Sequence, residues 1–323
     1  MPTFTGAAGA TAMAGVLLAG MPAFAQDADC DRACLIAVTD TYLNALAAHD
    51  PAAAPLADDV AFVENVTPMA PGEGLWATTT QGPTTFSIHV PDTALQQAGW
   101  MGMLESDDAP VLVAIRLKLE DGLIVEAEHI AAPITSEASL ARLETPRAGL
   151  VSEIPEESRL PHDELGEIGL SYYDALDDND GSLMPFADDC QRHENGMVTA
   201  GPEAGGGPNA DPDRAPVARL CAPQLDSQSF VYIDRIENRR LVAADPVTGL
   251  AMGFSHFRHP FDNLPYTVTH TDGSTSERNS ENMPYDPFDM PAAHVFKIGA
   301  DGMVHEIEAN GIVVPYQSPT GWE

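Results

Sequence analysis

Residues 42–65 read YLNALAAHDPAAAPLADDVAFVEN, and residues 172–195 read YYDALDDNDGSLMPFADDCQRHEN. The two stretches align without a gap and share the pairs Tyr42/Tyr172, Ala45/Ala175, Leu46/Leu176, Asp50/Asp180, Pro55/Pro185, Ala57/Ala187, Asp58/Asp188, Asp59/Asp189, Glu64/Glu194 and Asn65/Asn195. A second echo pairs LEDGLIVEAEHI at 119–130 with GADGMVHEIEAN at 299–310. Matching starts and matching ends predict two copies of one unit, each of domain length rather than a short solenoid repeat.

The composition favours a globular protein with an acidic surface. The chain has 323 residues, of which 44% are hydrophobic, and this is enough to fill two cores. Its formal net charge is −34, and a surface this acidic repels phosphate backbones and anionic lipids. We therefore expect neither nucleic acid nor a membrane surface as a partner.

The N-terminus has the pattern of a secretory leader. Residues 1–25 carry no charged side chain, the stretch 10–20 is apolar and small, and Ala23-Phe24-Ala25 is typical of a cleavage site before Gln26. We expect a signal peptide over residues 1–25 and a periplasmic or secreted protein. The apolar run is too short to span a membrane, and no later segment is long enough.

Four cysteines in an exported chain predict disulfides. Cys30 and Cys34 lie at the start of the first expected helix, and Cys190 and Cys221 flank a loop rich in Gly and Pro. We favour the pairs Cys30–Cys34 and Cys190–Cys221, one in each unit. The other two pairings stay open.

Hydrophobic periodicity predicts the same order of elements in both units. In the first unit we expect a helix over 34–49, a short helix or turn over 55–59, and strands over 60–65, 84–90, 99–105, 110–120 and 123–132. In the second we expect a helix over 163–177, strands over 190–197, 230–238, 239–245, 250–259, 293–298 and 303–314, a loop over 200–215 and a long insertion between 259 and 291. This order predicts an α+β fold in which an antiparallel sheet wraps around a helix. We divide the chain into a first domain, 26–134, a linker, 135–159, with a helix near 136–143, and a second domain, 160–323.

Several short motifs resemble a known superfamily. A helix with Y-x-x-A-L, an acidic turn (PLADDV or PFADDC) and a following meander of strands resemble the SnoaL-like branch of the NTF2-like superfamily. More narrowly, CDRACL, ALAAHD, VAFVEN, GEGLW and RHENGM resemble an uncharacterised (DUF8021-like) family of exported proteins with paired units. The resemblance implies two tandem NTF2-like cones, each a curved antiparallel sheet wrapped around N-terminal helices with a pocket inside. It also implies a wide choice of activities, from isomerases, dehydratases, cyclases and lyases to non-catalytic binders.

Alternation along the strands selects candidate catalytic residues in the second unit. In such a cone alternate strand residues face the pocket. The candidates by strand are Cys190, Arg192 and Glu194 on one strand, His256 with Arg258 or Phe257 with His259 on a second, and His294 with Phe296 on a third. We name as candidate catalytic residues Arg192, Glu194, His256 and His294, with a tyrosine as hydroxyl donor. A carboxylate or imidazole in an apolar pocket can act as a general base, and a nearby Arg can stabilise an enolate or alkoxide.

Aromatic residues supply the candidate substrate-binding surface: Tyr172, Tyr173, Phe254, Phe257, Phe296 and Trp76. Each site residue also has a structural interpretation. Glu64 and Glu194 occupy the same place in both copies, which favours a shared structural task, and Arg192 beside Glu194 can be a simple ion pair. The histidines, the tyrosines and Trp76 can equally be core or solvated residues.

No motif supports a metal or a cofactor. His256 and His259 have the spacing H-x-x-H, but on a strand this spacing directs the two rings to opposite faces. The run at 177–181, DDNDG, departs from the EF-hand pattern and is typical of a turn. The chain lacks G-x-S-x-G, G-x-G-x-x-G, P-loop and H-E-x-x-H motifs. We therefore expect chemistry without a metal or a cofactor.

Together these features predict an exported, cofactor-independent enzyme, a lyase, isomerase or dehydratase, that acts on a hydrophobic small molecule by general acid–base chemistry. The alternative is a non-catalytic protein that binds such a molecule in the same pocket. Phe62 stands where the second unit has Arg192, so the two pockets cannot be chemically equivalent, and the first unit can serve as an assembly surface. We expect the two units to pair within the chain, and the same surface can also form a homodimer.

Overall fold

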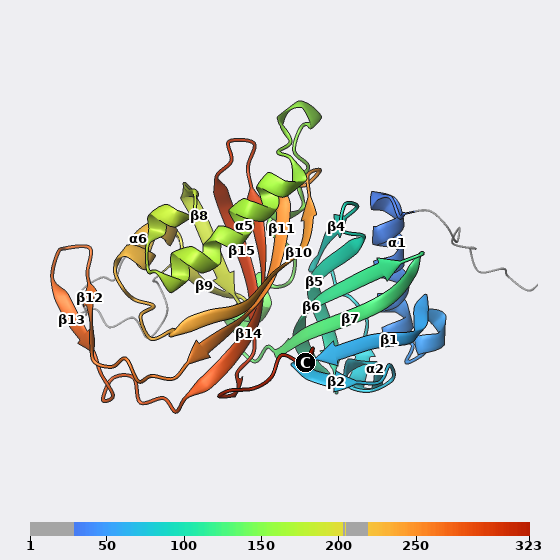
Figure 1. Ribbon diagram of the computed structural model, residues 1–323, viewed down its shortest axis with the longest axis horizontal. Coiled ribbons are helices and arrows are strands. Elements are labelled where there is room, and N and C mark those ends of the chain that lie inside the picture. The colour runs from blue at the N-terminus through green and yellow to red at the C-terminus, as the bar shows by residue number, and fades with distance from the viewer. Residues whose placement is uncertain (1–28, 203, 205–218) are drawn as a thin grey trace, which may run out of the picture.

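The computed structural model describes residues 29–202, 204 and 219–323. In these residues the chain forms two curved sheets that stand side by side, each associated with one long helix (Figure 1). The signal peptide predicted over 1–25 lies outside the described residues, as does most of the loop predicted over 200–215. Within the described ranges, no helix has both the length and the apolar character needed to cross a bilayer.

The first unit is built on helix α1 (Arg32–Ala47). The carboxylate of Asp31 caps this helix, because it accepts a hydrogen bond from the backbone N–H of Cys34 at 2.8 Å. Apolar residues at helical spacing, among them Leu35, Tyr42 and Leu46, are buried against the sheet. The other elements are η1 (Pro51–Ala53), β1 (Leu56–Glu64), β2 (Thr67–Met69), α2 (Leu75–Thr78), β3 (Thr79–Gln81), β4 (Ser87–Asp92), β5 (Gln97–Ser106), β6 (Ala109–Glu120) and β7 (Leu123–Pro133). The spatial order is β2-β1-β7-β6-β5-β3, with β4 also paired to β5.

The second unit repeats this plan after a linker. The linker carries α3 (Glu137–Arg142), α4 (Ala148–Val151) and η2 (Glu156–Ser158). The second unit consists of α5 (His162–Asp177), η3 (Gly181–Leu183), β8 (Phe186–Glu194), β9 (Met197–Ala200), α6 (Cys221–Asp226), β10 (Arg235–Asp245), β11 (Leu250–His259), β12 (Tyr266–Thr269), β13 (Thr275–Arg278), β14 (Phe288–Ile298), β15 (Val304–Gly311) and β16 (Val314–Pro315). The spatial order β9-β8-β15-β14-β11 matches β2-β1-β7-β6-β5 of the first unit, and β10 pairs with β11 as β4 pairs with β5. The predicted fold class, two tandem α+β units with a curved sheet around a helix, is therefore confirmed.

Two details differ from the prediction. Each sheet contains one parallel pair, β1 with β7 and β8 with β15, so the sheets are mixed rather than antiparallel. The two strands of each parallel pair lie far apart in the sequence, one near the start of the unit and one near its end. Such a pair has no connecting hairpin turn, so the sequence gives no local signal for it. Residues 55–59, expected as a short helix or turn, mostly belong to strand β1. The helical turn comes earlier, at η1, where the Asp50 carboxylate accepts a hydrogen bond from the N–H of Ala52.

The outer faces of the two sheets pack against each other and form a third apolar core. Its members are Phe86, Ile88, Val90, Met101, Met103, Leu112, Ala114 and Ile130 from the first sheet, and Val242, Ala243, Leu250, Met252, Phe254, Ala293 and Val295 from the second, with Ile134, Leu143 and Leu150 from the linker side. The Arg240 guanidinium, 2.8 Å from the Glu128 carboxylate, crosses this contact. The two units thus pair within the chain, as we expected, and each keeps its helix on the other face of its sheet.

Both expected disulfides are present. Cys30 is joined to Cys34 at the start of α1, and Cys190 of β8 is joined to Cys221 of α6. After β16 the chain crosses to the first unit, where the ring of Trp322 lies 5.6 Å from the guanidinium of Arg116. The domain boundaries expected at 134 and 160 stay a prediction.

Candidate functional site

A cavity of about 150 Å³ lies between helix α5 and the inner face of the second sheet. Its walls are formed by Tyr172, Leu176, Glu194, Asn195, Met197, Phe230, Tyr232, Ile233, Phe257, His259, Met290, Ala292, His294, Ala309, Asn310 and Gly311. Apolar protein cavities of about 150 Å³ accommodate a ligand the size of benzene. The lining is mostly aromatic and aliphatic, with a few polar groups, which is the usual composition of a small-molecule site.

Strand alternation decides which side chains reach the cavity. On β11, Phe257 and His259 line it, while His256 points to the opposite face of the sheet. On β14, His294 lines it, while Val295 belongs to the core between the units. Because successive side chains of a strand alternate between faces, these positions follow directly from the register of the sheet.

Arg192 lies behind the cavity wall and holds two of its polar groups. Its side chain is only 2% exposed, and its Nε is 3.0 Å from a carboxylate oxygen of Glu194. Its Nη1 donates to the hydroxyl of Tyr172 at 3.2 Å, and its Nη2 donates to the side-chain oxygen of Gln224 at 2.6 Å. The guanidinium also lies over the ring of Phe230, 5.1 Å from its centroid. With its donors engaged by the protein, Arg192 orients Glu194 and Tyr172 and does not line the cavity itself.

The hydroxyl of Tyr172 has a proton to offer a ligand. A guanidinium has only donors, so the Tyr172 oxygen must accept the hydrogen bond from Arg192. Among the described residues, no acceptor takes the proton of this hydroxyl. Burial raises the pKa of Tyr172 to about 12, although the charge of Arg192 opposes the rise, so the hydroxyl stays protonated at neutral pH. Tyr172 therefore presents a neutral hydrogen-bond donor beside the carboxylate of Glu194.

His294 presents a second neutral donor. Burial lowers the pKa of His294 to about 3, with a smaller contribution from the charge of Arg192, so the imidazole carries a single proton at neutral pH. Its Nδ1 lies 3.2 Å from the hydroxyl of Tyr173, which is fully buried and needs an acceptor. If Tyr173 donates to Nδ1, the histidine proton resides on Nε2. That nitrogen has no hydrogen-bond partner among the described residues, and His294 lines the cavity.

A flat aromatic wall closes the cavity around His259. Four rings surround this imidazole with planes within 28° of its own: Phe288 at 4.4 Å, Tyr232 at 5.6 Å, and Phe257 and Phe261 at 6.3 Å. Burial lowers the pKa of His259 to about 4, so the ring is neutral. No described side chain pairs with its ring nitrogens, and its Nδ1 is buried without a partner. The wall therefore presents the rings of Phe257 and Tyr232 and one neutral imidazole to the cavity.

The structure brings together part of the predicted site. Glu194, His294, Tyr172 and Phe257 line the cavity. Arg192 lies directly behind it, and Tyr173 and Phe296 belong to the core of the same unit, in ring contact with His294.

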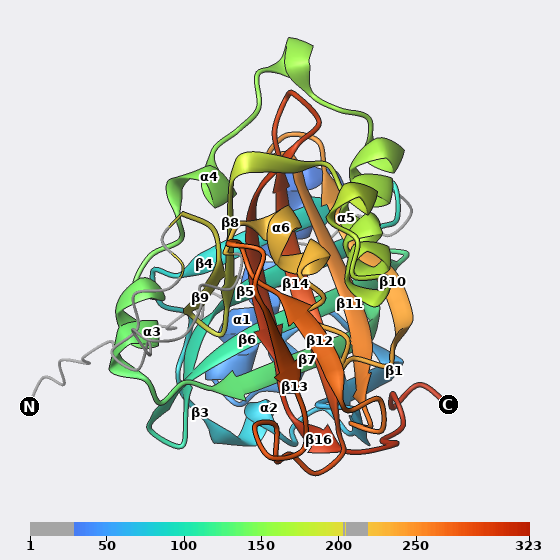
Figure 2. The same ribbon diagram turned by 90° about the vertical axis from the view of Figure 1, so that its left-hand side faces the viewer.

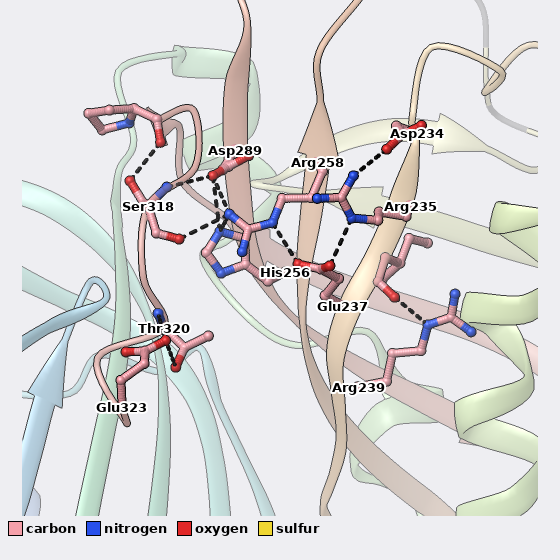
Figure 3. A network of polar contacts seen from close by, with 12 residues as sticks. Asp234, Arg235, Glu237, Arg239, His256, Arg258, Asp289, Ser318, Thr320 and Glu323 are labelled. Carbon is pink, nitrogen blue, oxygen red and sulfur yellow. Dashed lines mark hydrogen bonds and ion pairs between the residues drawn. The ribbon is translucent and has the colours of Figure 1, made fainter.

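Three predicted residues lie elsewhere. His256 is on the outer face of β11, where its Nε2 is 3.6 Å from Asp289 and the chain segment around Ser318 covers it (Figure 3). Phe254 belongs to the core between the units. Trp76 belongs to the core of the first unit, where its ring contacts Tyr42 edge to face.

The first unit holds a hydrogen-bonded chain at the corresponding place. The hydroxyl of Tyr42 is 2.9 Å from Nε2 of His129, and Nδ1 of His129 is 3.1 Å from the carboxylate of Glu64. Glu64 also accepts from the backbone N–H of Leu75. All of these groups are buried, and Phe62 stands where the second unit has Arg192. The carboxylate of Glu64 is thus occupied with structural bonds, whereas the side chain of Glu194 is 38% exposed.

The repeated Asn explains part of the repeat motif. Asn65 and Asn195 both have φ near 50°, a left-handed conformation that Asn tolerates better than most residues. Each side-chain amide bonds both backbone groups of one residue on the neighbouring strand, Ala131 in the first unit and Gly311 in the second. Asn occurs in both units because both turns need a residue with this conformation and these backbone bonds. Glu64 and Glu194, in contrast, make different contacts.

Sequence reasoning missed part of the aromatic wall. Phe230 and Tyr232 line the cavity from the segment that precedes β10, which the sequence predicted as strand. In the structure residues 227–232 form turns and β10 begins only at Arg235, so strand alternation could not have placed these two rings. No group of three metal-ligating side chains comes together within the part of the chain that the structure describes.

Residues 158–311 match the model of a family described as a domain of unknown function, DUF8021. Curated proteins give no match.

Solved structures match at low identity. A protein from Silicibacter sp. TM1040 described as a polyketide cyclase is 15% identical, with 48% of this chain and 92% of that chain covered and a TM-score of 0.29. SalBIII, an epoxide hydrolase/cyclase-like enzyme of pyran ring formation in salinomycin, is 14% identical over 46% of this chain and 92% of its own, with a TM-score of 0.28. A protein from Kribbella flavida described as a ketosteroid isomerase is 18% identical over 39% and 93%, with a TM-score of 0.27.

Proposed function

We propose that the second unit is a cofactor-independent acid–base enzyme for a small, flat, hydrophobic carbonyl compound. The observation that carries the proposal is the placement of a partly exposed carboxylate, Glu194, in a cavity that also presents two neutral donors, Tyr172 and His294. Glu194 acts as the general base on a carbon next to the carbonyl. Tyr172 and His294 stabilise the negative charge that then develops on the carbonyl oxygen.

This assignment divides the predicted roles differently from the sequence analysis. Arg192, expected to stabilise an enolate, acts as a positioning residue because its donors are engaged by Glu194, Tyr172 and Gln224. Proton abstraction followed by reprotonation or by loss of a leaving group gives an isomerase, a dehydratase or a lyase. The two disulfides support export to an oxidising compartment, periplasmic or extracellular.

The test is exchange of the protons next to the carbonyl of cyclohexanone or acetophenone in D₂O, followed by NMR. Replacement Glu194→Gln is expected to reduce the protein-catalysed exchange about 10²- to 10⁴-fold, and Tyr172→Phe about 10²-fold. The matched control is Glu167→Gln, because Glu167 is an exposed carboxylate on the same unit. Exchange that is equally fast in wild type and Glu194→Gln would refute the assignment of the base.

The second candidate is a protein that binds such a compound without transforming it. The ion pair between Arg192 and Glu194 favours it, because the guanidinium engages the carboxylate in a structural contact. Ligand binding to wild type without any exchange above that of the ketone alone would establish this function instead.

A further inference from the structure

An insertion distinguishes the second unit from the first. In the first unit, strands β5 and β6 are joined by a tight turn at residues 107–108. Their counterparts β11 and β14 are joined by residues 260–287, which include the hairpin of β12 and β13. This hairpin lies on the side of the second unit that faces away from the first (Figures 1 and 2).

The insertion holds the segment 227–233, which we call the wall segment because it carries three cavity-lining residues, Phe230, Tyr232 and Ile233. Three backbone carbonyls of the wall segment, those of Ser227, Ser229 and Val231, accept hydrogen bonds from the insertion. The backbone N–H of Thr269 donates to Ser227 at 2.9 Å, the hydroxyl of Tyr266 to Ser229 at 3.3 Å, and the side-chain amide of Asn263 to Val231. The outer side of the wall segment is therefore bonded along its length.

A stacked ring adds to these bonds. The ring of Phe261 lies 6.0 Å from that of Tyr232, with only 3° between their planes. Phe261 has a φ of 55°, a left-handed conformation that is rare for a bulky residue and costs free energy. Because such strain persists only where surrounding contacts over-determine it, the stack on Tyr232 is a specific feature of the insertion.

The inner side of the wall segment is fixed by the unit itself. The guanidinium of Arg192 lies over Phe230, and the backbone N–H of Phe230 donates to the side chain of Asn179 at 3.0 Å. The wall segment is thus held by Arg192 and Asn179 of the unit itself and, on its other side, by the insertion. Movement of the wall outward, which would enlarge the cavity, requires the bonds from Asn263, Tyr266 and Thr269 to break.

We propose that the insertion 260–287 is a specificity element, in which Asn263 and Tyr266 are positioning residues that fix the aromatic wall and restrict the cavity to a ligand with a single flat ring. The proposal rests on the proposed function in placing the ligand in this cavity, and it adds the size and shape of that ligand. It does not depend on whether Glu194 performs chemistry.

The test uses benzene and naphthalene as probes, because neither carries a carbonyl and both report the wall rather than the proposed chemistry. Saturation-transfer NMR on the full mature chain gives the ratio of their affinities, and hydrogen–deuterium exchange reports the backbone of the wall segment. The variant Asn263→Ala/Tyr266→Phe removes two of the three outer bonds. The matched control is Asp262→Ala, since Asp262 is exposed and adjacent.

Wild type is expected to prefer benzene over naphthalene about tenfold or more, which is the discrimination that a rigid apolar pocket gives for excess bulk. The double variant is expected to lose most of this preference and to show faster exchange in the wall segment, with Asp262→Ala unchanged. An unchanged affinity ratio, unchanged exchange in the wall segment, or no binding of either probe to wild type overturns the proposal. Failure of the proposed function would be seen in a different measurement. It would abolish the protein-catalysed proton exchange of the ketone and leave the ratio of benzene to naphthalene affinity unchanged.

Discussion

Glu308 lies on β15, on the face that points away from the cavity. Its side chain is 1% exposed, 3.6 Å from the guanidinium of Arg147 and 3.9 Å from the ring of His193. Burial raises the pKa of the Glu308 carboxyl to about 7, although Arg147 opposes the rise. A glutamate in an unfolded chain titrates near 4.3. The native state therefore binds this proton more tightly, and the free energy of unfolding falls as the pH rises from about 4 to about 7.

Replacement Glu308→Gln is expected to remove this loss of stability. Relative to wild type, the variant gains free energy of unfolding on the order of 3 kcal/mol between pH 5 and pH 8, because its amide cannot ionise in the buried site. Urea unfolding at several pH values measures the difference. The control is Glu306→Gln, a partly exposed neighbour that also pairs with Arg147, at 2.6 Å. A wild type and a Glu308→Gln variant with parallel pH profiles would contradict the account.

Strand alternation separates the two faces of β8 and of β11, but it does not by itself show which face turns toward the cavity. On β8, one face carries Cys190, Arg192 and Glu194, and these residues all lie on the cavity side. On β11, alternation separated His256 from Phe257 but could not say which one faces inward. Both faces of this strand are buried, because the outer face packs on the first unit. Both faces of β11 carry polar residues, His256 and Arg258 on the outer face and His259 on the inner one, so polarity alone cannot show which face turns inward.

At the scale of single elements, the N-terminus of α5 is tied to the first unit through Asp92 at the end of β4. The Asp92 carboxylate is fully buried and accepts hydrogen bonds from the backbone N–H groups of Ala94, Leu95 and Ala244. It also lies 2.8 Å from Nε2 of His162, the first residue of α5. This contact connects the first unit to the helix that carries Tyr172.

His162 gives this connection a pH dependence. Partial burial lowers the pKa of His162, but hydrogen bonds to the carboxylates of Asp163 and Asp92 outweigh this effect and raise it overall. Its contribution to stability is therefore fully present below the unfolded value of about 6.5 and is lost as the pH rises through the higher native pKa. Replacement His162→Gln is expected to lower the thermal midpoint more at pH 5.5 than at pH 9. The corresponding difference in the free energy of unfolding is less than about 1 kcal/mol, because the ring is partly exposed.

The control for this contact is Asp163→Asn, which removes the exposed partner and keeps the bond to Asp92. It should lower the midpoint less than His162→Gln does. Equal effects of His162→Gln at both pH values would show that the bond to Asp92 does not depend on protonation of the ring.

The whole molecule depends on the core between its two sheets. That core uses side chains from both units and from the linker, and the two outer sheet faces cover each other within one chain. A homodimer, which the sequence left open, would therefore need a different surface from this one. The repeated motifs predicted the duplication, and the resemblance to the NTF2-like superfamily implied the pairing. The sequence did not predict the parallel strand pairs or the positions of Phe254 and His256, since these depend on which faces meet in space.

A shared core implies that the two units unfold together. The three tryptophans of the chain report on the first unit, since Trp76 and Trp100 are in its core and Trp322 lies against its Arg116. Phe296 is buried in the core of the second unit, and its replacement by Ala is expected to cost about 3–5 kcal/mol. If the units are coupled through the third core, Phe296→Ala lowers the urea midpoint seen by tryptophan fluorescence and by circular dichroism equally. A fluorescence midpoint that stays at the wild-type value while the dichroism shifts would show that the first unit is stable without the second.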